Sequence, residues 1–489
     1  MDYREFIEKN KYEMIKTLQD LIRIDSKQDR PFKTKEGEIY PFGQGVDRAF
    51  KFTLKKAREL GFDTENVDNY GGHIDMGGYI LDEEGDIERE SLYTLGILGH
   101  LDVVPDGEGW TKDPFSGLEK DGKIYGRGAQ DDKGPVVAAL YAMKALKDSG
   151  FVPAKKVRLI LGLDEETGWE GMDYYFKYQP KADFGFTPDA DFPIINGEKG
   201  IMTFTLAKKI GKTQNSGLEL RTITGGTAPN MVPASARAVV RSEDKDVYAK
   251  IKDKAAEYRL KTSNRINIKG VGKSLEILAI GKSSHGAKPE DGINAISILM
   301  DFLKEINFVN EDCNDIIDFY NKYIGMETDG QSLGCKLSDE KSGDLTLNVG
   351  QVSLDQESIS ITINVRYPVS FDDQKVYDLI QPLLTRYDFG LIKGRHQAPI
   401  FMDEDSPLIK TLMDVYQEHT GDMESKPLVI GGGTYARAME NTVAFGGLFP
   451  GDEDRMHQKD ECIGIDTMMK MCHIYADAIY RLTREEDLL

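Results

Sequence analysis

The chain has 489 residues and a formal net charge of −21. A chain of this length is too long to fold around a single hydrophobic core, so two domains, or three, are expected. The acidic balance argues against nucleic acid or an anionic membrane as partner, because phosphate groups require a basic surface.

No apolar stretch approaches the roughly 20 residues of a membrane span. Residues 1–24 carry apolar side chains at helical spacing but lack the apolar block of a signal peptide. The cysteines lie far apart, without zinc-finger or redox spacing: Cys313, Cys335, Cys462 and Cys472. Scattered reduced thiols are typical of a cytosolic protein, so a cytoplasmic location with no membrane partner is expected.

Residues 92–200 alternate between predicted strands and helices. Strands are predicted at 92–98 and 157–163, and Phe184–Phe186 leads to a further turn; a helix is predicted over 135–146, with Pro at its start and Gly150 beyond its end. Strands that alternate with helices imply a largely parallel sheet. Ligands of such sheets bind beyond the carboxyl ends of the strands, and these side chains fall there: His100, Asp131, Glu166 and Asp189.

The pattern changes near Lys199, where strand-like stretches without buried parallel character begin. Segments 240–251 and 365–380 resemble each other, each with a Val-Arg pair, an acidic turn and a helix with Val-Tyr and Ile. An α+β insert of two related halves is one explanation, and chance similarity is an equal alternative because the spacings differ. The segment 310–347 reads as acidic and loop-like.

After residue 400 the α/β pattern returns. Helices are predicted at 407–417 and 468–482, and strands at 428–430 and 442–445. The first domain is therefore expected to be discontinuous, comprising residues 1–198 and 400–489, with residues 199–399 inserted.

Five side chains form the most informative set: His100, Asp131, Glu166, Asp189 and His457. Two imidazoles and three carboxylates suit a pair of borderline divalent ions such as zinc, cobalt or manganese. His100 and Asp102 share a side of an extended chain, so Asp102 can accept the other ring N–H. The set predicts metal-assisted hydrolysis.

Two pairs of adjacent acids leave their roles open. Asp131 and Asp132 precede a helix, where acids are favoured for capping alone, and either could instead bridge two cations. Glu165 and Glu166 end a buried strand and point in opposite directions, so one can bind metal while the other acts as general base. A solvated acidic turn is the alternative for the second pair.

Two features of the later sequence are further candidates. His285 follows a predicted strand inside the insert. The run Gly431–Gly433 is no phosphate loop, since no Gly-Lys-Ser/Thr follows it. Close approach of its backbone to a ligand is expected instead, with Gly433 as a substrate-binding position.

Five stretches in order carry a family resemblance: GHLDVVP (99–105), YGRGAQDDKG (125–134), DEETG (164–168), PDADFPIINGEKG (188–200) and GDEDRMHQKDE (451–461). They resemble the dinuclear zinc metallopeptidases that include aminoacylases, carboxypeptidase G and succinyl-diaminopimelate desuccinylase. More narrowly, they look like bacterial dipeptidases of the peptidase V type. The resemblance covers essentially the whole chain. It implies an α/β catalytic domain whose mostly parallel sheet is sandwiched by helices, with an inserted α+β lid of two similar halves.

The resemblance also implies roles for individual residues. His100 and Asp189 would bind one metal, Glu166 and His457 the other, and Asp131 would bridge them. Asp102 would orient His100, and Glu165 would be the general base. In the lid, His285 would stabilise the oxyanion, and Asn230 and Arg366 would bind the substrate's C-terminal carboxylate.

The implied activity is hydrolysis of unbranched dipeptides, including β-alanyl and Xaa-His dipeptides, with two Zn²⁺ ions, or Mn²⁺ or Co²⁺, as cofactors. A lid of two halves imitates the dimer of related enzymes and suggests a monomer. The same site could serve an N-acyl-amino-acid deacylase or a carboxypeptidase. A non-catalytic metal-binding or solute-binding protein is a further alternative, but such a protein has no use for a base at Glu165.

Overall fold

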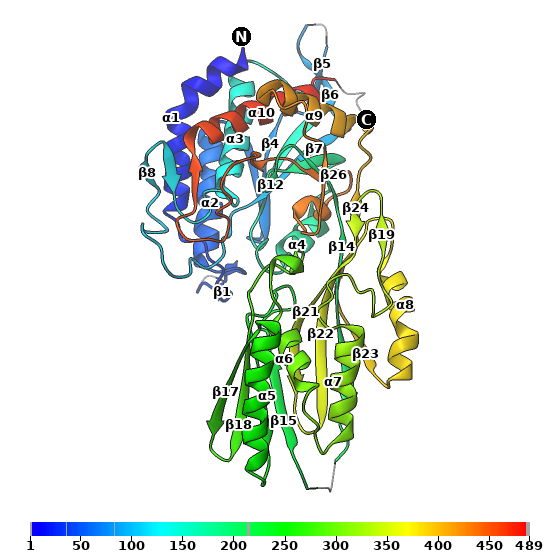
Figure 1. Ribbon diagram of the computed structural model, residues 1–489. Coiled ribbons are helices and arrows are strands. Elements are labelled where there is room, and N and C mark those ends of the chain that lie inside the picture. The colour runs from blue at the N-terminus through cyan, green and yellow to red at the C-terminus, as the bar shows by residue number, and fades with distance from the viewer. Residues whose placement is uncertain (1, 36, 83, 213–215, 486–489) are drawn as a thin grey trace. The chain divides into compact units, whose positions relative to one another are not determined.

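The computed structural model describes residues 2–35, 37–82, 84–212 and 216–485 (Figure 1). The chain forms two compact units. The discontinuous unit comprises Met1–Asn196, Met402–Leu428 and Gly433–Leu489, and the insert unit comprises Gly197–Phe401 and Val429–Gly432. The sequence places 429–432 with the first domain. This segment groups with the insert because its carbonyls accept from insert residues, Ile430 from the Lys199 amide at 2.9 Å and Gly431 from Arg366 at 2.9 Å.

The sheet of the discontinuous unit has the strand order β13-β26-β11-β7-β10-β4-β3. Its bounds are β3 Asp63–Val67, β4 Gly71–Met76, β7 Thr94–His100, β10 Lys156–Gly162, β11 Phe184–Thr187, β13 Ile195–Glu198 and β26 Thr442–Ala444. The central strands β26, β11, β7 and β10 are parallel, and the flanking strands pair antiparallel. Runs of buried residues along β7 and β10 are typical of a sheet covered on both faces.

Parallel pairing brings the predicted site residues to one edge of this sheet. His100 is the last residue of β7 and lies opposite Gly162, the last residue of β10. The acidic run 164–166 follows β10 directly, and Asp189 follows β11 by two residues. The carboxyl ends of three neighbouring strands therefore deliver these side chains to the same edge.

The helices of this unit include three that pack together, since α1 and α10 both contact the almost wholly buried α3. The helix bounds are α1 Tyr3–Ile22, α2 Gln44–Glu59, α3 Lys133–Asp148, α4 Glu170–Tyr178, α9 Pro407–Thr420 and α10 Ile465–Thr483, with a 3₁₀ turn η2 at Tyr435–Ala438. Short peripheral strands are β1 Phe32–Lys33, β2 Ile39–Tyr40, β5 Tyr79–Leu81, β6 Ile87–Glu90, β8 Leu118–Lys120, β9 Lys123–Tyr125, β12 Ala190–Asp191, β27 Gly447–Leu448 and β28 Cys462–Gly464.

The insert unit is built on an antiparallel sheet of order β17-β18-β16-β15-β21-β22-β14-β23. Its strands are β14 Gly200–Lys209, β15 Glu219–Gly225, β16 Ser235–Arg241, β17 Arg265–Val271, β18 Ser274–Ile280, β21 Thr346–Leu354, β22 Ser358–Tyr367 and β23 Gly390–Gln397. Its helices are α5 Asp246–Thr262, α6 Ala295–Leu303, α7 Glu311–Tyr323 and α8 Asp373–Arg386, with η1 at Pro289–Asp291. Smaller strands are β19 Ser338–Asp339, β20 Gly343–Asp344, β24 Ile400–Phe401 and β25 Leu428–Ile430.

The two halves of this sheet have equivalent strand orders, β17-β18-β16-β15 and β23-β14-β22-β21. The similar segments 240–251 and 365–380 occupy equivalent places, because each runs from the end of a strand (β16 or β22) into a helix (α5 or α8). Strand β14 holds the position in the second half that β18 holds in the first. In the sequence, however, β18 is the last strand of its half, whereas β14 comes at the start of the insert, before the other strands of its half. The second half is therefore a circular permutation of the first, and the predicted fold class, an α/β domain with an inserted lid of two similar halves, is confirmed.

The interpretation of residues 310–347 as loop-like is wrong over Glu311–Tyr323, which form α7. Asn310 caps this helix, its side chain accepting from the Asp312 amide at 3.0 Å. The acidic residues obscured an apolar face at helical spacing that is buried against the insert core: Cys313, Ile316, Ile317, Phe319 and Tyr320.

All four cysteines are buried and unpaired. Among the helices of the described residues, none combines the length with the apolar character that crossing a bilayer requires.

Asp477 ties the closing helix to two others. Its carboxylate, 4% exposed, accepts from Tyr3 of α1 at 3.1 Å and lies 3.1 Å from His419 of α9. Arg481 donates to both carboxylate oxygens, at 3.0 and 2.9 Å. Burial raises the pKa of Asp477, but the hydrogen bonds from His419 and Arg481 outweigh it and lower the pKa to about 2.

We expect Asp477→Ala to lower the free energy of unfolding by about 2–4 kcal/mol at pH 7, because three partly buried donors, on Tyr3, His419 and Arg481, lose this acceptor. A depressed carboxyl pKa stabilises the fold above the unfolded value near 3.8, and this stabilisation is lost as pH falls toward 2. The difference between variant and parent should therefore shrink below about pH 4. Urea unfolding across pH measures it, with exposed Asp414→Ala of α9 as control; equal losses in both variants would contradict the assignment.

Candidate metal centre

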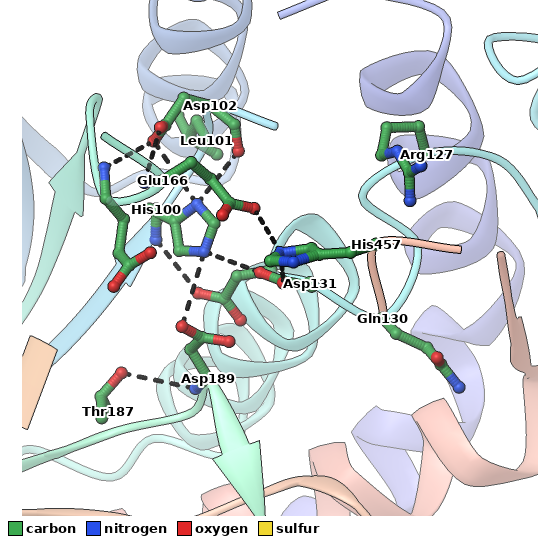
Figure 2. A network of polar contacts seen from close by, with 12 residues as sticks. His100, Leu101, Asp102, Arg127, Gln130, Asp131, Glu166, Thr187, Asp189 and His457 are labelled. Atoms are coloured by element: carbon green, nitrogen blue, oxygen red, sulfur yellow. Dashed lines mark hydrogen bonds and ion pairs between the residues drawn. The ribbon is translucent and has the colours of Figure 1, made fainter. Parts of the chain in front are cut away.

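Residues from five separate segments gather at the carboxyl edge of the central strands (Figure 2). His100 ends β7, Asp131 precedes α3, Glu166 follows β10 and Asp189 follows β11. His457 arrives from the loop between β27 and β28, and its φ of +60° is unusual for a residue with a side chain. All five predicted ligands therefore lie in the discontinuous unit.

The Asp131 carboxylate lies between the two imidazoles. Its Oδ1 is 2.9 Å from Nε2 of His100, and its Oδ2 is 2.9 Å from Nε2 of His457. Glu166 Oε1 is 3.1 Å from the same His457 nitrogen. Asp132 faces elsewhere, because its Oδ2 accepts from the His100 amide at 3.0 Å. Of the two adjacent aspartates, Asp131 is the one whose side chain faces both histidines.

Two groups of side chains place their ligand atoms within 4.8 Å of one another. One comprises His100, Asp131 and Glu166; the other comprises His100, Glu165 and Asp189. Asp189 Oδ2 is 3.6 Å from Nε2 of His100. Glu165, the predicted base, thus lies beside Asp189, and Glu166 lies beside Asp131.

Asp102 is fully buried and contacts both sides of the site. Nδ1 of His100 lies 3.0 Å from the Asp102 backbone oxygen and 3.4 Å from its Oδ1. The carboxylate also accepts from the amides of Glu165 and Glu166, each at 3.2 Å. Asp102 therefore fixes the acidic turn as well as facing the imidazole.

Burial and crowding of negative charge shift the acids of this site. Burial, together with the Asp131 charge, raises the pKa of Glu166 to about 7 and also raises that of Asp189. Burial raises the pKa of Glu165 well above its usual range. Hydrogen bonds to Asp131 and Glu166 raise the pKa of the half-exposed His457 to about 11.

These residues fit a pair of divalent cations. Their donors are imidazole nitrogen and carboxylate oxygen, the set that zinc, manganese and cobalt accept. Buried carboxylates that face one another need compensating positive charge. Asp102 and Asp132 already accept hydrogen bonds from the backbone of the Glu165–Glu166 turn and of His100. Supporting hydrogen bonds of this kind are usual around metal ligands.

The segments that carry Asn230, His285 and Arg366 are linked by short contacts, the last two by way of Gly431 of the glycine run. We call these four residues the insert cluster. The Asn230 carbonyl accepts a hydrogen bond at 2.7 Å from the backbone amide of Gly286, the residue after His285. A Cβ on Gly431 would lie 3.2 Å from that of Ala287. Asn230 and His285 are exposed, whereas Arg366 is buried and also contacts Asn364 at 3.0 Å. Gly433 is an exposed loop residue in the discontinuous unit.

Glu461 is a residue of this centre to which the sequence assigns no role. Its carboxylate is fully buried, pairs with Arg127 at 2.7 Å and accepts from the amides of Gln130 at 2.9 Å and Asp131 at 3.3 Å. It thereby holds the backbone that carries Asp131. The one sequence signal for this role is that Glu461 ends the motif at 451–461. In such a charged stretch, the sequence does not distinguish a buried glutamate from an exposed one.

An α/β unit with histidines and carboxylates at the ends of parallel strands has the make-up of a metal-dependent hydrolase. A family model described as peptidase family M20/M25/M40 matches residues 96–481. The chain belongs to this peptidase family, which confirms the family resemblance, and it is a peptidase.

Relatives cover the whole chain. "Putative dipeptidase YtjP" of Bacillus subtilis (strain 168) is 37% identical over 488 residues, which are 99% of this chain and 100% of its own length. "Putative dipeptidase SAB1611c" of Staphylococcus aureus (strain bovine RF122 / ET3-1) is 36% identical over 490 residues, with the same coverage.

Solved structures share the fold. Aminoacylhistidine dipeptidase from Vibrio alginolyticus has a TM-score of 0.54 at 15% identity, covering 95% of this chain and 96% of its own. Human carnosine dipeptidase 1 has a TM-score of 0.52 at 15% identity, covering 98% and 97%. At this identity the likeness is one of fold.

We expect Glu461→Ala to lower the free energy of unfolding by about 3–5 kcal/mol, because Arg127 is left buried without its partner. Metal affinity should fall as well, since the amides of Gln130 and Asp131 lose their acceptor. Denaturant unfolding and elemental analysis after dialysis measure the two effects. Glu453→Ala, which removes an exposed Glu–Arg pair in the same loop, is the control, with a change below about 1 kcal/mol. Parental metal content in Glu461→Ala would contradict the role.

Proposed function

We propose that this peptidase is a metal-dependent dipeptidase that hydrolyses unbranched dipeptides, including β-alanyl and Xaa-His dipeptides. The observation that carries the proposal is the Asp131 carboxylate between His100 and His457, with Glu165 and Asp189 on one side and Glu166 on the other. Full-length similarity to relatives named as dipeptidases supports the substrate class.

Two divalent ions, Zn²⁺ or alternatively Mn²⁺ or Co²⁺, are assigned to this centre. His100 and Asp189 would hold one, Glu166 and His457 would hold the other, and the Asp131 carboxylate, which faces both histidines, would serve both. When bound, such ions lower the pKa of water and polarise a carbonyl oxygen.

Glu165 is assigned as the general base. It accepts a proton from the attacking water and returns it to the departing amine, so its carboxylate ends the cycle unchanged. Its location supports the role, because it lies beside His100 and Asp189 while Asp102 fixes its backbone amide.

The insert cluster is assigned to substrate recognition. His285 donates to the oxyanion that develops on the scissile carbonyl. Arg366 and Asn230 bind the free carboxylate of a dipeptide, with Gly433 as a further backbone contact, so longer peptides fit poorly. The Arg366–Gly431 hydrogen bond, the contact of Ala287 with Gly431 and the Gly286–Asn230 hydrogen bond support a shared role for these segments. The duplicated insert supports action as a monomer.

A panel of unbranched dipeptides, matching tripeptides and N-acyl amino acids tests the substrate class, alongside elemental analysis of the purified protein. We expect dipeptides to be hydrolysed with a kcat/KM at least about 100-fold above that of matching tripeptides, because the carboxylate contacts favour short substrates. Preference for acylated amino acids or tripeptides would indicate the deacylase or carboxypeptidase alternative. Metal binding without hydrolysis of any class would indicate a binding protein.

Glu165→Ala should lower kcat by about 10²–10⁴-fold, the usual contribution of a general base. Metal content should equal that of the parent, because Glu165 is not among the assigned ligands. Steady-state kinetics and elemental analysis give the two values. Near-parental turnover would remove Glu165 from the chemistry, and Glu119→Ala, a change of an exposed glutamate in β8, serves as the control.

His285→Ala should lower kcat by about 10²–10³-fold through loss of an oxyanion donor. Metal content and the free energy of unfolding should stay at parental values, because His285 is exposed and is not among the assigned ligands. Kinetics on a good dipeptide measure the effect, with exposed Lys282→Ala in the same loop as control. An unchanged rate would exclude the loop from catalysis.

A further inference from the structure

The acidic turn after β10 is held by hydrogen bonds to one buried residue, Asp164. Its backbone oxygen accepts from the amides of Thr167, Gly168 and Trp169 at 3.2–3.3 Å. Its carboxylate accepts from the Gly171 amide at 3.2 Å, at the start of α4. The turn that carries Glu165 and Glu166 is thus a defined structure that ends at Trp169.

Trp169 joins this turn to α4 with φ of +67° and ψ of +15°. This left-handed conformation costs free energy for any residue with a Cβ, and glycine is the residue that adopts it readily. A bulky aromatic residue at such a position indicates that its side chain makes contacts that offset the strain.

The indole of Trp169 makes two such contacts. Its Nε1–H donates to the Glu165 backbone oxygen at 2.9 Å. Its ring packs at 62° against Tyr435, with centroids 5.1 Å apart. Tyr435 in turn packs edge-on against His100, with centroids 6.2 Å apart. Trp169 therefore contacts the Glu165 backbone directly, and the ring of Tyr435 connects it to His100 of the metal centre.

Gly162 makes room for this arrangement. A Cβ at that position would lie 2.3 Å from the Tyr435 ring and 2.6 Å from its hydroxyl. Tyr435 is completely buried, and its hydroxyl has no hydrogen-bond partner among the described residues. The ring is thus placed there by packing between Trp169 and His100, not by a polar anchor of its own.

The backbone on either side of Glu165 is consequently held at both ends. Its amide donates to Asp102 at 3.2 Å, and its carbonyl accepts from Trp169 at 2.9 Å. With both peptide groups fixed, only side-chain rotation remains to move the carboxylate relative to His100 and Asp189.

We propose that Trp169 is the positioning residue for Glu165, holding the backbone that aims its carboxylate at the reacting water. The inference rests on the proposed role of Glu165 and deepens it. Loss of the indole N–H would let the turn shift, and a displacement near 1 Å of a catalytic group can cost about 100-fold in rate.

The test compares Trp169→Phe, which keeps a ring against Tyr435 but removes the donor, with Trp110→Phe. Trp110 is the other tryptophan of the chain, and its indole also donates to a backbone oxygen, that of Asp106. We expect Trp169→Phe to lower kcat by about 10–100-fold, with KM, metal content and melting temperature near parental values. Trp110→Phe should keep the parental kcat. An unchanged kcat in Trp169→Phe overturns the proposal, and so does a loss that only follows reduced metal content or melting temperature.

A double variant separates this inference from the proposed function. In a Glu165→Ala background, Trp169→Phe should cause no further loss of residual rate; a further loss of the same size would mean that Trp169 acts elsewhere, and overturns the inference while leaving Glu165 as base. If the parent hydrolyses no dipeptide, the proposed function fails by itself. The Trp110→Phe variant keeps Trp169 as its single tryptophan, so its fluorescence then tests the inference without any measurement of activity. Adding Zn²⁺ to its metal-free form should shift the tryptophan emission, and an unchanged spectrum overturns the coupling of Trp169 to the centre.

Discussion

Buried carboxylates crowd together at one edge of the central sheet, and the surrounding structure is organised to hold them there. Asp131, Glu166 and Asp189 face His100 and His457 in a site where burial penalises every charge. Three neighbouring parallel strands deliver His100, Glu166 and Asp189 to one place, and Asp131 and His457 reach it from a helix start and a loop. Such a cluster is tolerable for the fold when cations neutralise it, so the stability of this edge and its chemistry have the same origin.

A second layer of acids supports the first in a uniform way. Asp102 accepts from the amides of Glu165 and Glu166, Asp132 accepts from the amide of His100, and Glu461 accepts from the amides of Gln130 and Asp131. In each case a buried carboxylate fixes the backbone that carries a proposed ligand or base. Hydrogen bonds of this kind orient metal ligands and add negative potential that favours cations.

Much of this arrangement is predictable from the sequence because its signals are local. Apolar runs ending at His100 and before Glu166 define strands and the residues at their carboxyl ends, and Pro135 and Gly150 mark the ends of a helix close to α3. Near one edge of the sheet, β4 pairs antiparallel with both β10 and the edge strand β3, which no local run indicates.

Other features depend on contacts between distant positions. The helix α7 was obscured because its acidic residues dominate composition while its apolar face shows only in the packed insert. Glu461 and Arg127 are 334 positions apart, and only the folded chain shows that the pair is buried. Trp169 looks like an ordinary helix-start residue in sequence, since neither its positive φ nor its bond to Glu165 has a compositional signal.

The permuted order of the insert brings its two chain ends together. Ile201 of β14 pairs with Gln397 of β23, and Gly197 pairs with Phe401 one step further out. The polypeptide thus leaves and rejoins the discontinuous unit through adjacent strands, only one inter-strand spacing of about 5 Å apart. An ancestral enzyme could have acquired or lost the whole module at this point with a linker of a few residues, because neighbouring termini are where domain insertion is tolerated.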